Sequence, residues 1–330
     1  MNTFSNKQAG LTLVELMVAL AIGSFLMIGA VQIYSQSRQA FVVNESIARV
    51  QETAQFAMDT IEADLRMASN WGRNSRPLAV EGRSIAGIAN PNTLPEPNLC
   101  GDGWALDVAM IVDGDNNGYT LPCTPGRVGF PVAAQPNSDS FTVRRATVVP
   151  AALQAGRLQI QTTRIQGRLF ADGLVPAGFS PADSTTHNLL VNSYYVAADS
   201  ELIPGVPTLR RKSLGVVAGA PGIVDQEIAP GVENLQIQLG IDVDEDNTVD
   251  RYVNPGVAGE AIYDPAAAEY IPGARVMTAR VWLLVRGVTQ EIGIQQVRGF
   301  QPGDINLGVP SDTFRRIQVS KTILLRNART

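Results

Sequence analysis

Histidine and cysteine, the residue types behind much nucleophilic and metal-dependent catalysis, are nearly absent from this chain. Its 330 residues include a single histidine, His187, and two cysteines. The motifs H-E-x-x-H, G-x-x-x-x-G-K-[ST] and G-x-S-x-G, which mark metalloproteases, phosphate-binding loops and α/β-hydrolases, do not occur. Carboxylate pairs could still serve a glycosidase, but scattered acids on an acidic protein are usually surface residues. We therefore predict that the chain is not an enzyme.

An excess of basic residues is also lacking. The chain has 26 Lys and Arg against 31 Asp and Glu, a net charge of -5 and a pI near 5.1. Nucleic-acid-binding domains usually carry a basic patch or stripe, so we predict no nucleic-acid partner. We expect the one short basic run, Arg210-Arg211-Lys212, to be a solvated strand face.

A long apolar run is present, from Leu11 to Val31. At 1.5 Å per residue, a helix of this length spans roughly the 30 Å hydrocarbon core of a bilayer. The flank Met1–Gly10 carries one charge, Lys7, which favours a cytoplasmic N-terminus and an exported remainder. The run exceeds the 7 to 15 residues of a cleaved secretory signal, and residues 28–36 offer a poor cleavage site. We predict a retained membrane helix.

Glu15 is the one charged residue in this run. A carboxylate at membrane depth costs on the order of 3 kcal/mol on insertion scales, so it indicates a function unless it snorkels to the head groups. The surrounding string, Gly10-Leu11-Thr-Leu-Val-Glu15, resembles the prepilin motif of type IV pilins and type II secretion pseudopilins. Family members usually have Phe where Leu11 stands, a change that processing is expected to tolerate.

This resemblance implies a processing site and an assembly residue. A membrane peptidase would cut between Gly10 and Leu11 and methylate the new amino terminus of Leu11. In the dry core of a filament an unpaired carboxylate is costly, but Glu15 could pair with the α-amino group of Leu11 on a neighbouring subunit. The implied segments are a leader at 1–10 and a transmembrane and filament-core helix at 11–31.

Beyond residue 31 the sequence predicts an α+β, pilin-like fold. Apolar residues recur at spacings of three and four from Ile47 to Ala68, which indicates an amphipathic continuation of the helix over 32–72, with stop signals at Asn70 and Gly72. For residues 73–330 the sequence predicts a large, mostly antiparallel β head. This head could form one domain or two. We expect strands at residues 104–112, 140–149, 158–161, 189–197, 235–241, 278–285 and 316–325.

The two cysteines, Cys100 and Cys123, stand 23 positions apart. In an exported domain a disulfide is the first interpretation, worth roughly 3 to 4 kcal/mol in the chain-entropy model. A zinc site would need two more ligands, and His187 has no C-x-x-C near it. Two free buried thiols remain as the alternative.

Residues 242–250 follow part of the ligand pattern of an EF-hand calcium loop. Oxygen ligands at positions 1, 3, 5, 7 and 9 would be Asp242, Asp244, Asp246, Thr248 and Asp250. Asn247 can adopt the left-handed conformation expected at position 6, but position 12, where a glutamate should close the site, is Val253. A weak calcium site and a solvated acidic loop both remain open.

A weaker metal candidate is Asp113-Gly-Asp115-Asn-Asn117-Gly118. Asp113, Asp115 and Asn117 fill positions 1, 3 and 5. We prefer to interpret Asn117-Gly118 as a type I′ hairpin turn, for which this dipeptide is typical.

Three features narrow the resemblance to the PilW-type minor pilins of type IV pilus systems. They are the segment Gly231–Asp242 followed by the acidic loop, the segment Val276–Arg286, and the terminal Ile323-Leu-Leu-Arg-Asn327. The chain's length of 330 also exceeds that of a typical major pilin.

The resemblance implies a fimbrial subunit that joins other minor pilins in a complex that starts pilus assembly at the tip and supports twitching motility. Its partners would be the minor and major pilins, the prepilin peptidase, the inner-membrane assembly platform and, as a further candidate, a large tip adhesin. The chain would sit in the bacterial inner membrane with a periplasmic head, then in the pilus. A J-type pseudopilin of type II secretion and a stably anchored periplasmic binding or adhesive protein are the alternatives.

Overall fold

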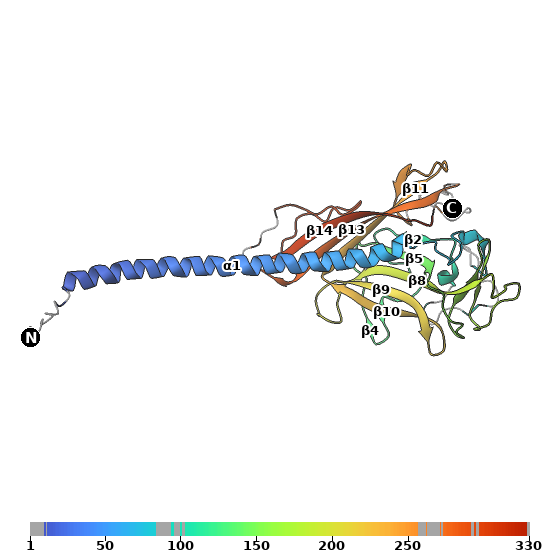
Figure 1. Cartoon of the computed structure of the whole chain (residues 1–330). Coiled ribbons are helices and arrows are strands. Elements are labelled where there is room, and N and C mark those ends of the chain that lie inside the picture. Colours follow the sequence, from blue (N-terminus) through green and yellow to red (C-terminus); the bar gives the residue numbers. More distant parts are fainter. Residues whose placement is uncertain are drawn as a thin grey trace, which may run out of the picture. The chain divides into compact units, whose positions relative to one another are not determined.

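The computed structural model of the chain describes residues 10, 12–83, 94–95, 100, 103–256, 262, 271, 273–291, 294 and 297–328. Its α-helix, α1 (Leu13–Arg66), continues for 54 residues (Figure 1). The chain divides into two compact units, Met1–Arg49 and Val50–Thr330.

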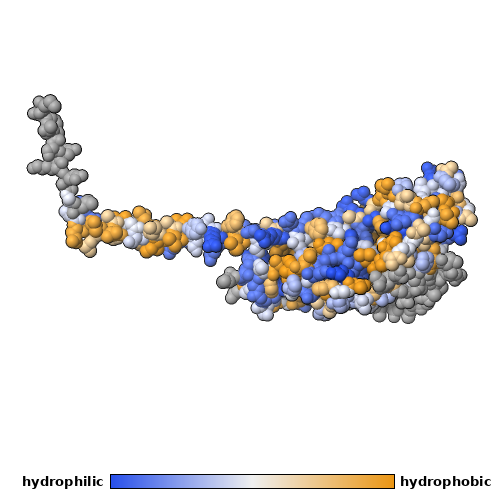
Figure 2. Space-filling model, turned by 90° about the horizontal axis from the view of Figure 1, so that it is seen from below, coloured by the Kyte–Doolittle hydropathy of each residue, from blue (hydrophilic) through white to orange (hydrophobic). Residues whose placement is uncertain are grey.

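In the first unit, α1 exposes nearly all of its apolar side chains. Leu13, Phe25 and Ile33 are 75%, 81% and 70% exposed, and Figure 2 shows hydrophobic residues gathered along this stretch. An i, i+4 ion pair forms here, with Arg49 Nη2 2.6 Å from Glu45 Oε1. Because this pair is largely exposed, it contributes only about 0.3–0.5 kcal/mol.

In the second unit, the remainder of α1 packs on the β-sheets through one buried stripe. Residues spaced three and four apart form it: Val50, Ala54, Ala57, Met58, Ile61 and Leu65. Fully burying a residue such as Ile61 stabilises the fold by about 1.5–3 kcal/mol. The periodicity predicted this face.

The helix ends at Arg66, and residues 67–69 form a turn before the stop signals at 70–72. The backbone leaves the helix to join the end of a strand. Ser69 N donates to Arg144 O, and Ala146 N donates to Asn70 O at 2.6 Å. Because these backbone hydrogen bonds to residues 144 and 146 replace helical ones, the helix ends before the predicted stop signals.

The larger sheet has eight strands. Its path is β1-β7-β6-β8-β5-β2, with β9 joining β8 to β10; all pairs are antiparallel except β1 with β7. The strands are β1 (Val80–Glu81), β2 (Val112–Asp115), β5 (Ser140–Ala146), β6 (Gln159–Thr162), β7 (Gly167–Phe170), β8 (Thr185–Ala197), β9 (Thr208–Val217) and β10 (Ala220–Pro230). A short pair, β3 (Gly126–Arg127) and β4 (Phe130–Pro131), stands apart.

The second sheet has four antiparallel strands in the order β12-β11-β13-β14. They are β11 (Val232–Asp242), β12 (Arg251–Val253), β13 (Arg275–Gln290) and β14 (Phe314–Leu324). The alternation at 235–241 predicted β11 correctly. Gln236 is nevertheless buried, because its amide donates to Asn137 O.

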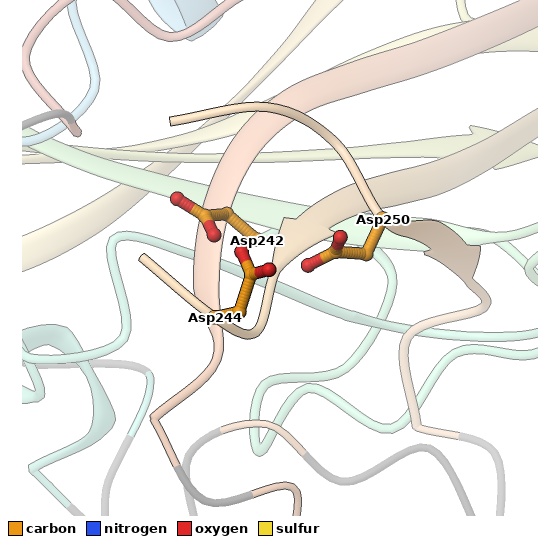
Figure 3. A group of neighbouring side chains, drawn as sticks. All are labelled: Asp242, Asp244 and Asp250. Atoms are coloured by element: carbon orange, nitrogen blue, oxygen red, sulfur yellow. The ribbon is translucent and has the colours of Figure 1, made fainter. Parts of the chain in front are cut away.

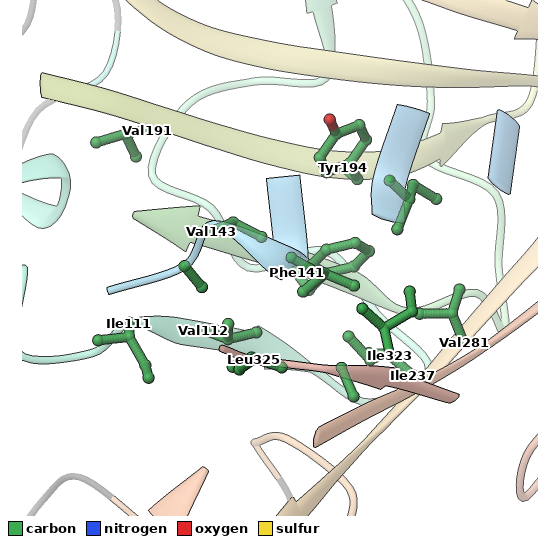
Figure 4. Packing of buried hydrophobic residues seen from close by; sticks show 14 of the residues in the cluster. Ile111, Val112, Phe141, Val143, Val191, Tyr194, Ile237, Val281, Ile323 and Leu325 are labelled. Atoms are coloured by element: carbon green, nitrogen blue, oxygen red, sulfur yellow. The ribbon is translucent and has the colours of Figure 1, made fainter. Parts of the chain in front are cut away.

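One apolar core joins the helix stripe to both sheets. Phe141 and Tyr194 stack with ring centroids 5.3 Å apart, close to Ile237, Val281 and Ile323 of the second sheet (Figure 4). The fold is therefore α+β, with a long N-terminal helix on mostly antiparallel sheets.

One predicted strand is wrong. Residues 104–112 form a 3₁₀ turn, η2 (Trp104–Leu106), and a bend, and only Val112 begins a strand. Gly103 at φ 64° starts the turn, and Arg144 donates to Trp104 O and Met110 O, so a buried side chain satisfies carbonyls that a strand would have paired. The apolar content of this segment did not distinguish a strand from a buried turn.

Candidate functional site

The N-terminal end of α1 carries the predicted processing and assembly residues. Gly10 is exposed, and a Cβ atom built on it would meet nothing within 4 Å among the described residues. Packing within the described chain therefore does not require glycine here. Leu11 lies outside the described residues.

Glu15 closes a capping box at the helix start, which our sequence interpretation missed. Glu15 Oε2 accepts hydrogen bonds from Thr12 N at 2.9 Å and Thr12 Oγ1 at 2.8 Å, and Glu15 N donates to Thr12 Oγ1 at 3.3 Å. The local signal was the T-x-x-E spacing, typical of a helix N-terminus. Within a single chain, Thr12 thus provides the carboxylate with local partners.

The helix after this cap has the dimensions of a membrane span. Over the described residues, one helix is long and apolar enough to cross a bilayer, and the residues of its most hydrophobic window are exposed. Ser24, a polar residue in this stretch, donates to Leu20 O at 2.7 Å, which satisfies its hydroxyl inside the helix.

The acidic loop between β11 and β12 brings three of its predicted ligands together. Oxygen atoms of Asp242, Asp244 and Asp250 lie within 4.8 Å of one another (Figure 3). Asp242 is fully buried at the end of β11, while the other two are exposed. Such an all-oxygen donor set suits a hard cation such as calcium.

Backbone hydrogen bonds shape this loop. Asp242 Oδ1 and Oδ2 accept from the N–H groups of Glu245 and Asn247, and Asp250 Oδ2 accepts from Val243 N. Asn247 has φ 67°, which confirms the left-handed conformation expected at position 6.

Two predicted ligands, Asp246 and Thr248, are not part of the triad and bind each other instead. The Asp246 carboxylate accepts from both N and Oγ1 of Thr248, and these hydrogen bonds lower the pKa of Asp246. Val253, at the closing position, is buried in β12. The residues present fit a partial calcium loop of three carboxylates.

The second aspartate loop does not form the hairpin we preferred. Asn117 has φ 57°, but Gly118 is not in the left-handed region, so the type I′ turn is absent. β2 instead pairs with β5, with Asp115 opposite Ser140. Asn117 N donates to Asp139, a buried residue that adjoins β5, which holds the loop in this other arrangement.

The disulfide between Cys100 and Cys123 is confirmed, with a Cα–Cα distance of 4.5 Å. Both residues are buried, and Trp104 Nε1 approaches Cys100 Sγ at 2.9 Å. His187 lies elsewhere in the fold, its ring nitrogens at Thr147 O and Thr185 Oγ1. The zinc alternative has no support among the described residues.

The basic run at 210–212 is not a solvated face, contrary to our expectation. Arg210 and Lys212 are buried, with nitrogens 2.6 Å and 2.8 Å from the two carboxylate oxygens of Asp225. Tyr195 donates to Asp225 Oδ2, and the chain after Cys123 covers the group: Gly126 N donates to Tyr195 OH, and Lys212 donates to Gly126 O. Cross-strand pairing of β9 with β10 places these charges together, which local sequence does not reveal.

Comparison with known protein families gives two matches. Residues 193–327 match the model of the type IV pilus-assembly protein W family, PilW, and residues 5–31 match the prokaryotic N-terminal methylation motif. The first match runs from β8 through β14 and includes the acidic loop; the second includes Gly10 and Glu15. No curated protein and no solved structure matches the chain.

Proposed function

Since this chain belongs to the PilW family of type IV pilus assembly proteins and carries a prepilin methylation motif, we propose that it is a minor pilin. It joins other minor pilins in a complex that starts pilus assembly and stays at the tip. The observation that carries the proposal is an uncovered membrane-length helix directly behind a prepilin cleavage motif. Such a helix serves first as a membrane anchor and then as a filament-core element. The family is one of structural assembly proteins that are generally not catalysts.

In this proposal the prepilin peptidase cuts between Gly10 and Leu11 and methylates the new amino terminus. The precursor sits in the inner membrane with its N-terminus in the cytoplasm and its head in the periplasm. Assembly then moves it through the inner-membrane platform into the pilus, beside the major pilin and the other minor pilins, and a large tip adhesin is a candidate partner of the head.

Glu15 acts as the assembly residue. Its carboxylate pairs with the α-amino group of Leu11 on a neighbouring subunit, which compensates a charge that is costly in a dry helix bundle. The capping box with Thr12 supports this role, because it gives the carboxylate local partners before a neighbour arrives.

The mass of the N-terminal peptide of the chain isolated from membranes tests processing directly. We expect a peptide that begins at Leu11 and carries one methyl group. Retention of Met1 would overturn the pilin proposal in favour of a stable anchor. Replacing Gly10 by a bulky residue should block cleavage, and a normal mature mass would contradict the assigned site.

Deletion of the gene distinguishes the two filament systems. A minor pilin of a type IV pilus predicts loss of surface pili and twitching with exoprotein secretion intact. A J-type pseudopilin predicts the reverse, and that result would move the chain to type II secretion.

We also propose that the loop of Asp242, Asp244 and Asp250 binds calcium with modest affinity. Three carboxylates within 4.8 Å repel one another unless a cation is present, and extracellular modules often bind calcium only at 10⁻⁴–10⁻³ M. Calcium should raise the melting temperature of the full chain, and Asp244→Asn should abolish the increase. Asp172→Asn, in another exposed loop, is the matched control. Equal melting temperatures with calcium and with chelator would show that the loop does not bind calcium.

A further inference from the structure

A second acidic site lies beside β2 and β5. It is a pocket of ≈ 320 Å³ lined by β2, β5, and the chain that follows the disulfide-linked segment. Residues with polar groups at its wall are Asp113, Asp115, Thr120, Ser140, Thr142 and Arg144. It involves none of the calcium-loop residues.

The strand register places the two acids on one face. Asp113 and Asp115 stand two positions apart on β2, so both side chains point to the same side of the sheet. Their direct partners across the antiparallel pair, Thr142 and Ser140, point the same way. Gly256 closes the wall beside Asp115, where any larger residue would meet Gly114 O at 2.9 Å.

Ser140 provides a buried acceptor that nothing in the described chain uses. It is 1% exposed, and its Oγ has no hydrogen-bond partner among the described residues. Leaving a buried hydroxyl unpaired costs roughly 1–3 kcal/mol, which an incoming donor would recover. Thr142 differs, because its hydroxyl already pairs with Ser193 at 2.7 Å.

The negative charge of the pocket is incompletely balanced. Among the described residues that line it, Arg144 is the one basic residue, and its guanidinium donates to Trp104 O and Met110 O. Burial raises the pKa of Asp113 although Arg144 opposes the shift, and the negative charges of Asp115 and Asp107 add to the rise. A second cation in the pocket would stabilise the ionised carboxylate.

The size of the pocket favours a side chain over a bare ion. Its ≈ 320 Å³ is at the lower limit of the roughly 300–1,000 Å³ typical of ligand pockets and about ten times the volume share of one water. Among the described residues, the three-carboxylate group that suits a metal is at Asp242, not here. An ammonium or guanidinium group offers only donors, which suits the acceptor oxygens of Asp113, Asp115 and Ser140. One oxygen of Asp115 also accepts a hydrogen bond from Thr120 Oγ1.

We propose that this pocket binds the ammonium or guanidinium group of a lysine or arginine side chain presented by a neighbouring pilin subunit, between Asp113, Asp115 and Ser140. We infer the cationic character of the ligand from the residues of the pocket. That the ligand comes from a neighbouring pilin rests on the proposed function. The contact would give the head a specific, charge-dependent attachment to the next subunit.

The first arm of the test uses the full chain in detergent and calorimetric titration with Nα-acetyl-lysine amide and Nα-acetyl-arginine amide. We expect saturable binding of at least one of them and none of Nα-acetyl-glutamine amide. Asp113→Asn and Ser140→Ala should each weaken binding roughly tenfold or more, as expected for a lost charge-assisted hydrogen bond.

Both substitutions should leave the melting temperature unchanged or raise it, because they remove a buried charge and an unpaired hydroxyl. Ser213→Ala is the matched control, since its Oγ is also unpartnered but does not line the pocket. No saturable binding, or equal binding of the glutamine amide, would overturn the proposal.

The second arm identifies the source. A photo-crosslinking residue at Pro122, an exposed position on the pocket wall, should capture a lysine- or arginine-containing peptide of another pilin in assembled pili, and Asp113→Asn should abolish the product. Crosslinks to segments without a basic residue would overturn the assignment of the partner. If the chain is absent from pili while the first arm succeeds, the proposed function fails and the binding chemistry stands.

Discussion

The carboxylate of Asp64 on α1 lies 2.6 Å from the guanidinium of Arg145 on β5. The same carboxylate accepts from Asn192 Nδ2 at 2.7 Å and from Tyr194 OH at 2.5 Å. One buried acid thus ties the helix to two neighbouring strands of the larger sheet. Glu62, two residues earlier on the helix, forms an ion pair with Lys321 of β14.

Replacing Asp64 by alanine should destabilise the head domain by about 3 kcal/mol or more, because Arg145 and two further donors lose their shared acceptor in a buried setting. Chemical denaturation of the full chain measures this loss. Asp59→Ala, an exposed acid on the same helix that pairs only locally with Gln55, should change stability by less than about 0.5 kcal/mol. Equal effects of the two substitutions would contradict the anchoring role.

Asp64 illustrates how far the sequence could predict the fold. The helix stripe from Val50 to Leu65 follows from periodicity, since apolar spacing depends only on local geometry. The burial of Asp64 depends on Arg145, 81 positions away, and on strand order, so no local signal marks it. The Arg210–Asp225 pair and the Ser140 pocket could not be predicted either, because they too depend on strand order.

The candidate site was predicted unevenly. Glu15 was identified by its motif, and its capping partner Thr12 was readable from the same string but missed. The acid spacing named five candidate ligands in the 242–250 loop, and three of them, Asp242, Asp244 and Asp250, lie together in the structure. It could not predict that Asp246 would bind Thr248, because that choice depends on how the loop closes.

Breaking the Cys100–Cys123 disulfide should lower the free energy of unfolding by roughly 3 to 4 kcal/mol, as expected for a loop of this size. The covalent loop also holds Gly126 over Tyr195 and Lys212, so reduction should admit water to that buried polar group. Denaturant melts of the double variant Cys100→Ser/Cys123→Ser measure the loss. Reduced wild-type protein is the control and should unfold at the same denaturant concentration as the variant. If neither is less stable than the oxidised wild type, packing alone holds the loop.

Replacing Glu15 by valine should leave membrane insertion intact and reduce incorporation into pili. The matched variant is Thr12→Val, which removes the capping hydroxyl, costs about 1 kcal/mol of helix stability and retains the carboxylate. Immunoblots of sheared pili and of membranes compare the two. If Thr12→Val reduces incorporation as much as Glu15→Val, capping and not subunit pairing is the role of Glu15.

Asp139 links the two sheets and predicts a pH dependence of stability. It is 1% exposed, and its two oxygens accept from Asn117 N and Ile237 N, each at 2.7 Å. Burial raises the pKa of Asp139 to about 7 from 3.8, although both hydrogen bonds oppose the shift. The nearby charges of Asp304 and Asp115 raise it further.

Because the pKa of Asp139 is higher in the folded state, the folded chain binds an extra proton between pH 3.8 and about 7. The stabilising contribution of Asp139 is therefore fully present below pH 3.8 and is lost as the pH rises through 7, a loss on the order of a few kcal/mol. Asp139→Asn cannot titrate, and its amide leaves one of the two backbone N–H groups without an acceptor. We expect the variant to be less stable at low pH by about 1–3 kcal/mol, with a difference from wild type that shrinks or reverses between pH 5 and pH 8. Denaturant melts of both proteins across this range measure the difference, and a constant difference would show that Asp139 does not titrate there.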